Sequence, residues 1–455
     1  MSDEAPSPPA LGRRALLTGA AALSALLATD PAAALGRVPT GGTLRMRVAW
    51  STRRLDPHDL FDPLAALFGT AIADPVYQLD YQGKPYPTLA DGMPTVQDGQ
   101  TVVHLRPGMR TAKGKALGGR DLAWSVSRAR QQGAAGLLAP LPRYVRSSKD
   151  DPLIARFGKT DPLKLAVLLA SPLVSLLPVG FSATSPDGSG PFRARCSASS
   201  LELTRNRNAA RGPSFLERVI VRSAPDLAAS LRAFESGQDD VGWLGLGLHR
   251  NRARARKFNY GRVGWVVLAT GRQAGRYAAP GVAQQLANAV PAERLHLGLS
   301  PRRGLGAGTP WRGDPATLLY DSSSGHLKTI AEAVAVKLSE PGHEVTATPV
   351  SRARLRRARA TNDFALALDV VRHPAAGPTG ALIALSTADR KSLGKDVALH
   401  PPRGNYSRPG HQLTTTLRLG VLGGLAVRGG VIKQVLLAAA RRGGGLDLGA
   451  SYRSP

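Results

Sequence analysis

The sequence predicts an α/β fold, and three observations lead to that prediction. From residue 264 to residue 371, short β-rich segments alternate with amphipathic helical segments. The chain contains 50 Gly and 35 Pro among 455 residues, which favours many turns and argues against a helical bundle. Hydrophobic residues make up 43% of the chain, and the length is enough for two or three domains.

Residue patterning places the expected elements of the first half. Asp62 can cap a helix that begins at Pro63, because a side-chain acceptor before a proline is a common helix start. Strand, polar turn and strand are expected over 203–221. Further strands are expected at 43–50, 100–110 and 163–171, and further helices at 117–130 and 226–237.

The second half follows a βαβ-like rhythm. A basic run at 249–258 precedes it, and a loop rich in Gly and Pro interrupts it at 298–315. Strands are expected at 264–270, 316–321, 344–350 and 363–371, with helices at 281–290, 326–340 and just before residue 363. We find no internal repeat of 20 to 50 residues.

The charge balance is strongly basic, with 60 Lys and Arg against 32 Asp and Glu and a formal net charge of +28. Such a field attracts anions, although a solvated surface that uses Arg as its main cation gives the same count. Cys196 is the single cysteine, and the nine histidines show no paired spacing, so we expect no metal and no cofactor. The sequence contains no G-x-S-x-G elbow, and we expect no enzymatic activity.

Residues 1–34 have the pattern of an export signal. Arg13 and Arg14 precede an apolar segment at 15–29 that is too short to span a membrane, and Ala32 to Ala34 supply a small-residue cleavage site. The paired arginines followed by apolar residues resemble a twin-arginine signal, and an ordinary secretory signal is the alternative. We therefore expect a mature protein in the periplasm or another extracytoplasmic compartment.

Seven segments, taken in order, resemble the extracytoplasmic solute-binding proteins of peptide and nickel ABC transporters, the bacterial extracellular solute-binding family 5. The resemblance covers roughly residues 43–372. One departure is Ala209-Ala210, where the family has an aromatic pair, so the chain resembles a diverged member. The matching segments are LDPH (55–58), HLRPG (104–108), DLAWSVSRAR (121–130), GSGPF (188–192), LTRNRNAARGPSFLERVIV (203–221), LRAFESGQDDVG (231–242) and the LLY…IAEAVAVKL pattern (318–338).

The resemblance implies a two-lobed fold of the periplasmic-binding-protein type II, with hinge strands between the lobes. It also implies capture of an oligopeptide or related small solute in the cleft and delivery to a membrane permease. We expect lobe 1 at 35–263, lobe 2 at 264–400 and a C-terminal return to lobe 1 at 401–455. We expect a monomer that binds no nucleic acid.

Candidate ligand residues follow from the family's cleft. Peptide-binding relatives have an acidic residue after the strand at 363–371, but here Pro374 stands near that place and no carboxylate lies between Asp369 and Asp389. Arg372 and His373 are present instead, and an arginine there favours a carboxylate or phosphate unless it points into solvent.

Three weaker candidates are His58, Trp243 and Trp265, each of which can equally be structural. Two functions outside ABC transport stay open: a secreted basic protein that binds an anionic polymer, for which 249–258 and 352–360 are the basic segments, and a degenerate family member that does not transport.

Overall fold

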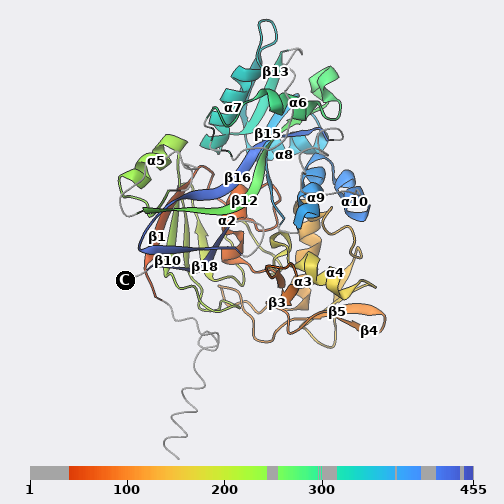
Figure 1. Ribbon diagram of the computed structural model, residues 1–455. Coiled ribbons are helices and arrows are strands. Elements are labelled where there is room, and N and C mark those ends of the chain that lie inside the picture. Colours follow the sequence, from red (N-terminus) through yellow and green to blue (C-terminus); the bar gives the residue numbers. More distant parts are fainter. Residues whose placement is uncertain are drawn as a thin grey trace, which may run out of the picture.

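The computed structural model describes residues 40–242, 255–295, 297, 299, 315–374, 377–400, 417–440 and 445–453. Its centre is a ten-stranded sheet in the order β14-β13-β15-β12-β16-β11-β1-β10-β9-β8 (Figure 1). The strands of this sheet are β1 (Thr43–Val48), β8 (Phe192–Cys196), β9 (Ser200–Arg205), β10 (Arg218–Ser223), β11 (Val241–Gly242), β12 (Ala255–Thr270), β13 (Ala316–Asp321), β14 (Val345–Val350), β15 (Leu366–Arg372) and β16 (Leu419–Ile432).

Three small sheets and a set of helices complete the fold. The small sheets pair β2 (Tyr77–Leu79) with β3 (Pro85–Pro87), β17 (Val435–Ala439) with β18 (Leu446–Arg453), and β4 (Thr95–Gln97), β5 (Gln100–His104), β7 (Ile154–Phe157) and β6 (Val145–Ser147) in that order. The helices are α2 (Pro63–Ile72), α3 (Gly119–Ala129), α4 (Pro162–Leu169), α5 (Leu227–Glu235), α6 (Val282–Ala289), α7 (Gly325–Leu338), α8 (Arg352–Thr361), α9 (Gly377–Asp389) and α10 (Lys391–Leu399). Short turns are η2 (Arg130–Ala134), η3 (Pro172–Val174) and η4 (Arg272–Ala278).

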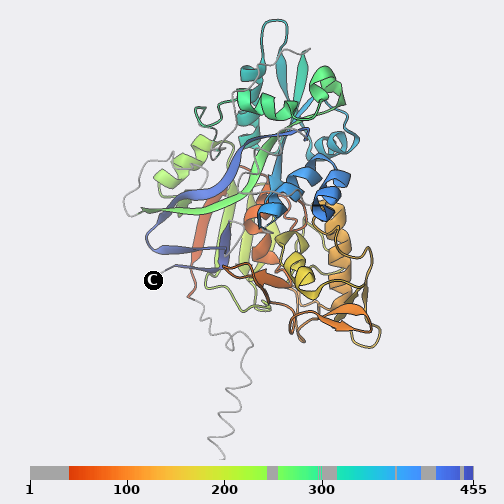
Figure 2. The same cartoon turned by 45° about the vertical axis from the view of Figure 1, so that its right-hand side comes forward.

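The molecule has two lobes joined by long strands. We call β13 to β15 with α6 to α10 the second lobe, and β1 to β11 with α2 to α5, β17 and β18 the first lobe. Strands β12 and β16 run antiparallel between them, from the pair Ala255 and Ile432 to the pair Ala269 and Leu419 (Figure 1). Helix α9 also contacts η2 of the first lobe, and both views place α9 and α10 beside that region (Figure 2). The α/β class and the two lobes with hinge strands are confirmed.

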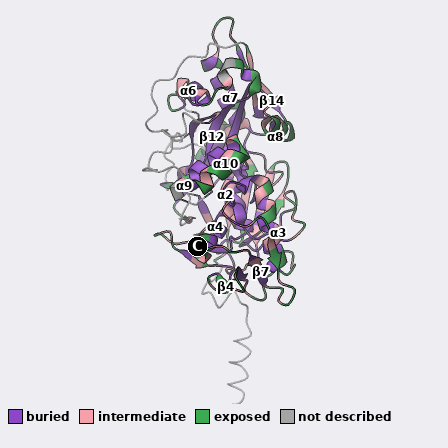
Figure 3. Ribbon diagram, turned by 90° about the vertical axis from the view of Figure 1, so that its right-hand side faces the viewer, coloured by how far each residue is buried: buried purple, intermediate pink, exposed green. Residues whose placement is uncertain are grey.

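The centre of the large sheet, at β15 and the second half of β12, is buried on both faces. Alternate residues of β12 enter two different hydrophobic clusters, with Val266 and Leu268 in one and Val267 and Ala269 in the other. Period-two alternation of side chains along a strand produces this division. Figure 3 shows the buried residues along the central strands and exposed residues on the outer sides of helices such as α8 and α10.

The predicted start of α2 is confirmed. The Asp62 carboxylate accepts hydrogen bonds from the backbone N–H groups of Leu64 (3.0 Å) and Ala65 (3.3 Å), with Pro63 at the first helical position. The strands expected around 203–221 are β9 and β10, which pair antiparallel.

One predicted strand is wrong. Residues 162–169 form helix α4 instead of the strand expected at 163–171. The continuous apolar run fits a buried strand or a buried helix equally well. The local signal that decides is Asp161 followed by Pro162, because the Asp161 carboxylate accepts from the Lys164 N–H at 2.6 Å and Pro162 occupies the first helical position. Of the helices within the described residues, none has the length and apolar character that a membrane crossing requires.

Candidate functional site

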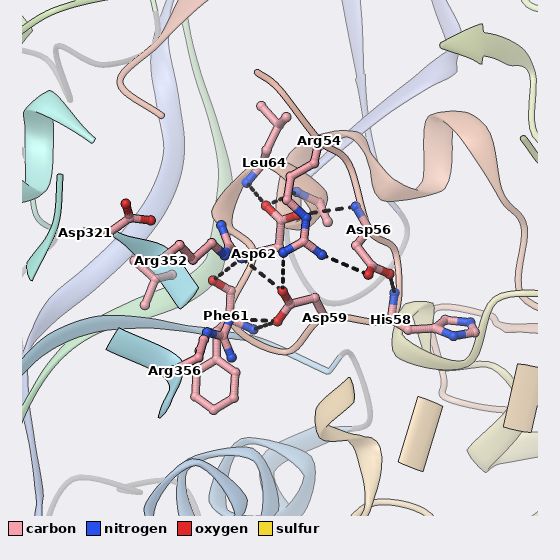
Figure 4. Close-up of polar contacts among 12 residues, drawn as sticks. Arg54, Asp56, His58, Asp59, Phe61, Asp62, Leu64, Asp321, Arg352 and Arg356 are labelled. Atoms are coloured by element: carbon pink, nitrogen blue, oxygen red, sulfur yellow. Dashed lines mark hydrogen bonds and ion pairs between the residues drawn. The ribbon is translucent and has the colours of Figure 1, made fainter. Parts of the chain in front are cut away.

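A buried ionic cluster joins the two lobes at the loop that follows β1 (Figure 4). Asp59 lies on this loop. Its carboxylate forms ion pairs with Arg356 Nη2 at 2.8 Å, Arg352 Nη2 at 3.0 Å and Arg54 Nη1 at 3.4 Å. Arg352 and Arg356 come from α8 of the second lobe, so two of these three ion pairs cross between the lobes. The Arg356 guanidinium also lies 4.0 Å from the centre of the Phe61 ring.

The charge of Asp59 depends on these arginines. Burial alone would raise the pKa of the Asp59 carboxyl, but Arg356, Arg352 and Arg54 outweigh it and hold that pKa well below its ordinary value. Asp62, equally buried but without a direct ion pair in the described residues, has a raised pKa because desolvation dominates. Asp59 is therefore the anion that fastens α8 to the first lobe.

A second arginine network anchors the same loop within the first lobe. Arg128, at the end of α3, donates from both terminal nitrogens to the two oxygens of Asp56, each at 2.8 Å. Arg54 adds a bond to Asp56 at 3.0 Å. Burial opposes ionisation of Asp56, yet the Arg128 pair lowers its pKa. This two-pronged contact keeps the loop rigid in the first lobe and so fixes where Asp59 stands.

Arg372 is buried, with 3% of its surface exposed, so the alternative of a solvated arginine at the rim is wrong. Its Nη1 donates to the carbonyls of Pro57 (2.8 Å) and Asp59 (3.0 Å), and its backbone N–H donates to Leu60 O at 2.8 Å. Burial lowers the pKa of the guanidinium. Arg372 therefore holds the end of β15 against the loop of the first lobe.

The other predicted site residues divide into two groups. His58 is fully buried and donates from Nε2 to Ser175 O at 2.7 Å, well inside the first lobe. His373 is partly exposed, and its ring lies 5.3 Å from that of Trp265, which is 5% exposed. Trp243 lies outside the described residues. The structure thus brings together Arg372, His373 and Trp265. Arg372 also contacts the carbonyls on either side of His58, whose own ring pairs with Ser175 instead.

A cavity of about 930 Å³ opens between the lobes, and we call it the interlobe cavity. The ends of the hinge strands contribute Ala269, Thr270 and Leu419 to its wall. Cationic side chains dominate its charge. They are Arg54, Arg352, Arg356, Arg359, Arg390, Lys391 and Arg418, against the acids Asp59, Asp369 and Asp389.

A second cavity, of about 290 Å³, is lined by residues of α2, β17 and β18 and by Arg211, and we call it the Arg211 cavity. Arg211 Nη1 contacts Asp74 Oδ1 at 3.2 Å there, and Asp447 faces the same space. Arg372 and His373 also line this cavity. Arg372, which lines this cavity, donates to the backbone carbonyl of Asp59, which lines the interlobe cavity.

Sequence reasoning missed the α8 arginines as site residues. Arg352, Arg356 and Arg359 stand at i, i+4 and i+7 and therefore share one helix face, which lines the interlobe cavity. The prediction from sequence treats 352–360 only as a basic segment and does not use this spacing. Asp59 carried no signal of its own, because its partners lie 293 and 297 residues further along the chain. Among the described residues, no three His, Cys, Asp or Glu side chains gather into a metal site.

Burial of His58 gives a testable pH dependence. Burial lowers the pKa of His58 from 6.5 to about 4. Between pH 6.5 and pH 4, His58 is therefore protonated in the unfolded chain but neutral in the folded chain. The free energy of unfolding decreases as the pH falls through this range. We expect His58 to make the free energy of unfolding about 2 kcal/mol lower at pH 5 than at pH 8.

Urea unfolding at both pH values measures this effect. His58→Gln keeps a donor for Ser175 O and should lose that part of the pH dependence. His400→Gln, at an exposed position, is the control and should keep the wild-type profile. An unchanged profile in His58→Gln would show that the buried ring is not what couples folding to pH.

Comparison with solved structures identifies the fold. NikA of Staphylococcus aureus, solved with Ni(L-His)2, matches over 91% of this chain and 100% of its own, with a TM-score of 0.68 and 13% identity. AppA of Bacillus subtilis, solved with a nonapeptide, matches over 92% and 100%, with a TM-score of 0.67 and 13% identity. AgaA of A. tumefaciens R10, solved with agropinic acid, matches over 91% and 99%, with a TM-score of 0.65 and 14% identity.

No family model and no curated protein matches the sequence. The structural likenesses nevertheless extend over nearly the whole chain, and they include oligopeptide- and dipeptide-binding proteins. The resemblance predicted from the seven ordered segments is thereby confirmed for the fold. The chain has the two-lobed fold of the peptide- and nickel-type periplasmic binding proteins.

Proposed function

We propose that this protein is the substrate-binding component of an ABC import system. It captures a small solute, an oligopeptide or a related compound, between its lobes and delivers it to a membrane permease. The observation that carries the proposal is the interlobe cavity of about 930 Å³, which has walls from both lobes and the ends of β12 and β16 beside it. The ligands of the neighbouring structures, a nonapeptide, a dipeptide and agropinic acid, support a solute of this size.

Capture would work by hinge closure, with no bond made or broken. A ligand that contacts both lobes favours the closed state by the difference between its affinities for the closed and open forms. The loop at 54–62 and the α8 arginines already meet across the lobes, so the same surfaces would surround a bound solute. We infer no enzymatic activity, because the proposed cycle consists of binding, closure and release.

The sequence-predicted residues enter the proposal in different roles. Arg372 and His373 would face a solute, or part of one, from the Arg211 cavity. His58 and Trp265 are buried and would position the loop and the hinge. We propose that lobe 1 comprises residues 35–263, that lobe 2 comprises residues 264–400, and that residues 401–455 return to lobe 1. We also propose that the protein is a monomer.

Ligand capture is tested by native mass spectrometry of protein purified without unfolding. We expect a co-purifying small solute. After the solute is removed by unfolding and refolding, adding it back should decrease the radius of gyration in small-angle X-ray scattering. A protein that carries no solute from its host, and whose radius of gyration does not respond to host extract, would contradict the proposal.

Export is a separate proposal, and it rests on residues 1–34, which lie outside the described residues. We propose a twin-arginine leader and a periplasmic or other extracytoplasmic location. Changing Arg13 and Arg14 together to Lys should abolish export of the chain, because the twin-arginine route requires the pair. Cell fractionation measures this, with Arg37→Lys, beyond the leader, as the control. Export that survives the double change would indicate the general secretory route.

A further inference from the structure

The interlobe cavity has an excess of positive charge that its own acids do not neutralise. Seven cationic and three acidic side chains line it, a formal excess of four positive charges. Asp59 is already shared by three of the arginines. Asp389 accepts Arg390 Nε at 3.3 Å and the Arg418 backbone N–H at 3.0 Å. Half of the formal excess therefore lies at the Asp59 cluster. The other half lies where Arg359, Lys391 and Arg418 line the cavity together with one acid, Asp369.

Arg359 is a cation of this wall with one unpaired donor, and the carboxylates of Asp369 and Asp389 act on its charge. Its Nη2 donates to Ala388 O at 2.7 Å, which fixes the guanidinium, while its Nη1 is buried and has no hydrogen-bond partner. Burial lowers the pKa of this guanidinium. Leaving a buried charged donor unpaired is costly, so an acceptor placed there is stabilised strongly.

Other unpaired atoms of the same wall extend the recognition pattern. Arg352 Nε and Thr270 Oγ1 are buried without a partner. Asp369 is 5% exposed, and its Oδ2 is also buried without a partner, while Oδ1 accepts from the Val370 N–H. Two arginine donors, Arg359 Nη1 and Arg352 Nε, therefore lack an acceptor, and one carboxylate oxygen, Asp369 Oδ2, lacks a donor.

We propose that the interlobe cavity selects an anionic small solute, one whose carboxylate or phosphate contacts Arg359 and whose hydroxyl or N–H group donates to Asp369. The rings of Phe61 and Phe364 line the same space and suit an apolar portion between these groups. This inference rests on the proposed function and names the substrate class for it. Guanidinium groups hold carboxylates and phosphates by strong charge-assisted hydrogen bonds, so Arg359 gives the selectivity.

The test compares wild type with two single changes on one helix. Arg359→Gln removes the cation of the cavity, and Arg357→Gln removes an exposed cation two residues away on α8. Each protein, freed of ligand, is incubated with a small-molecule extract of the host and analysed by native mass spectrometry. The exact mass of the released solute distinguishes a phosphate ester from a carboxylic acid. Competition with inorganic phosphate or with succinate checks that assignment.

We expect wild type and Arg357→Gln to retain the same anionic solute, and Arg359→Gln to bind it at least tenfold more weakly. A retained neutral or cationic solute would overturn the anion inference and leave the transport proposal intact. Equal affinity of Arg359→Gln and wild type for an anionic solute would overturn the role of Arg359. Retention of no solute by any of the three proteins would overturn both proposals.

Discussion

Asp59→Asn should lower the unfolding free energy by about 2 kcal/mol and move the lobes apart. The substitution keeps the shape of the side chain but removes the carboxylate that, among the described residues, forms an ion pair with each of Arg54, Arg352 and Arg356. Asp59 is buried, and breaking a buried pair leaves its partners uncompensated. The three arginine side chains are 23% to 32% exposed, and solvent screening reduces the cost below that of a fully buried pair.

Urea unfolding and small-angle scattering measure the two parts of this prediction. Asp363→Asn is the matched control, because Asp363 pairs with Arg272 at 2.8 Å but on the surface, with side chains 65% and 47% exposed. We expect that control to leave both the urea midpoint and the radius of gyration unchanged. If Asp59→Asn behaves like the control, the ionic cluster does not hold the lobes together.

Gly136→Ala should destabilise the contact between the first lobe and α9 by about 2 kcal/mol, since overpacking a tight contact costs about 1–3 kcal/mol. A Cβ at Gly136 would lie 2.2 Å from Thr387 Oγ1 and 2.9 Å from the backbone of Gly394. Both neighbours belong to the second lobe, so relief of the clash requires the lobes to separate or α9 to shift. We therefore expect a larger radius of gyration and weaker solute binding.

Gly92→Ala is the control for this change, because a Cβ at Gly92 meets no atom within 4 Å. It should leave thermal stability and scattering unchanged. Scattering in the presence of the co-purified solute adds a second measurement, since a ligand that favours closure should partly restore the smaller radius in Gly136→Ala. An unaltered radius and affinity in Gly136→Ala would mean that α9 adapts without moving the lobe.

Local patterns predicted most of the fold because they act over a few residues. The cap at Asp62, the alternation in 43–50 and the turn inside 203–221 all gave the observed elements. The strand expected at 163–171 failed where an apolar run fits two structures and the capping pair Asp161-Pro162 decided the outcome. A pattern predicts structure well where it fits one element only, as the cap at Asp62 does, and poorly where it fits both a strand and a helix.

The candidate site was harder to predict because its partners are distant in the chain. Arg372 was expected at the cleft, but nothing local shows that its guanidinium meets the carbonyls of Pro57 and Asp59, more than 300 residues earlier. The spacing of Arg352, Arg356 and Arg359 could have indicated one cationic helix face. Only the fold shows that Arg352 and Arg356 on this face reach Asp59 of the first lobe.

The position of β16 has a consequence for the order in which the chain can fold. This strand is contributed by residues 419–432, yet it lies between β11 and β12 and pairs with both. Without it the large sheet falls into two separate pieces, one of five strands ending at β11 and one of four ending at β12. The two pieces therefore cannot be joined until residues 419–432 have left the ribosome. Because the two pieces are joined only by a strand far along the chain, pairing across the centre of the sheet is non-local, which favours slow completion of the sheet.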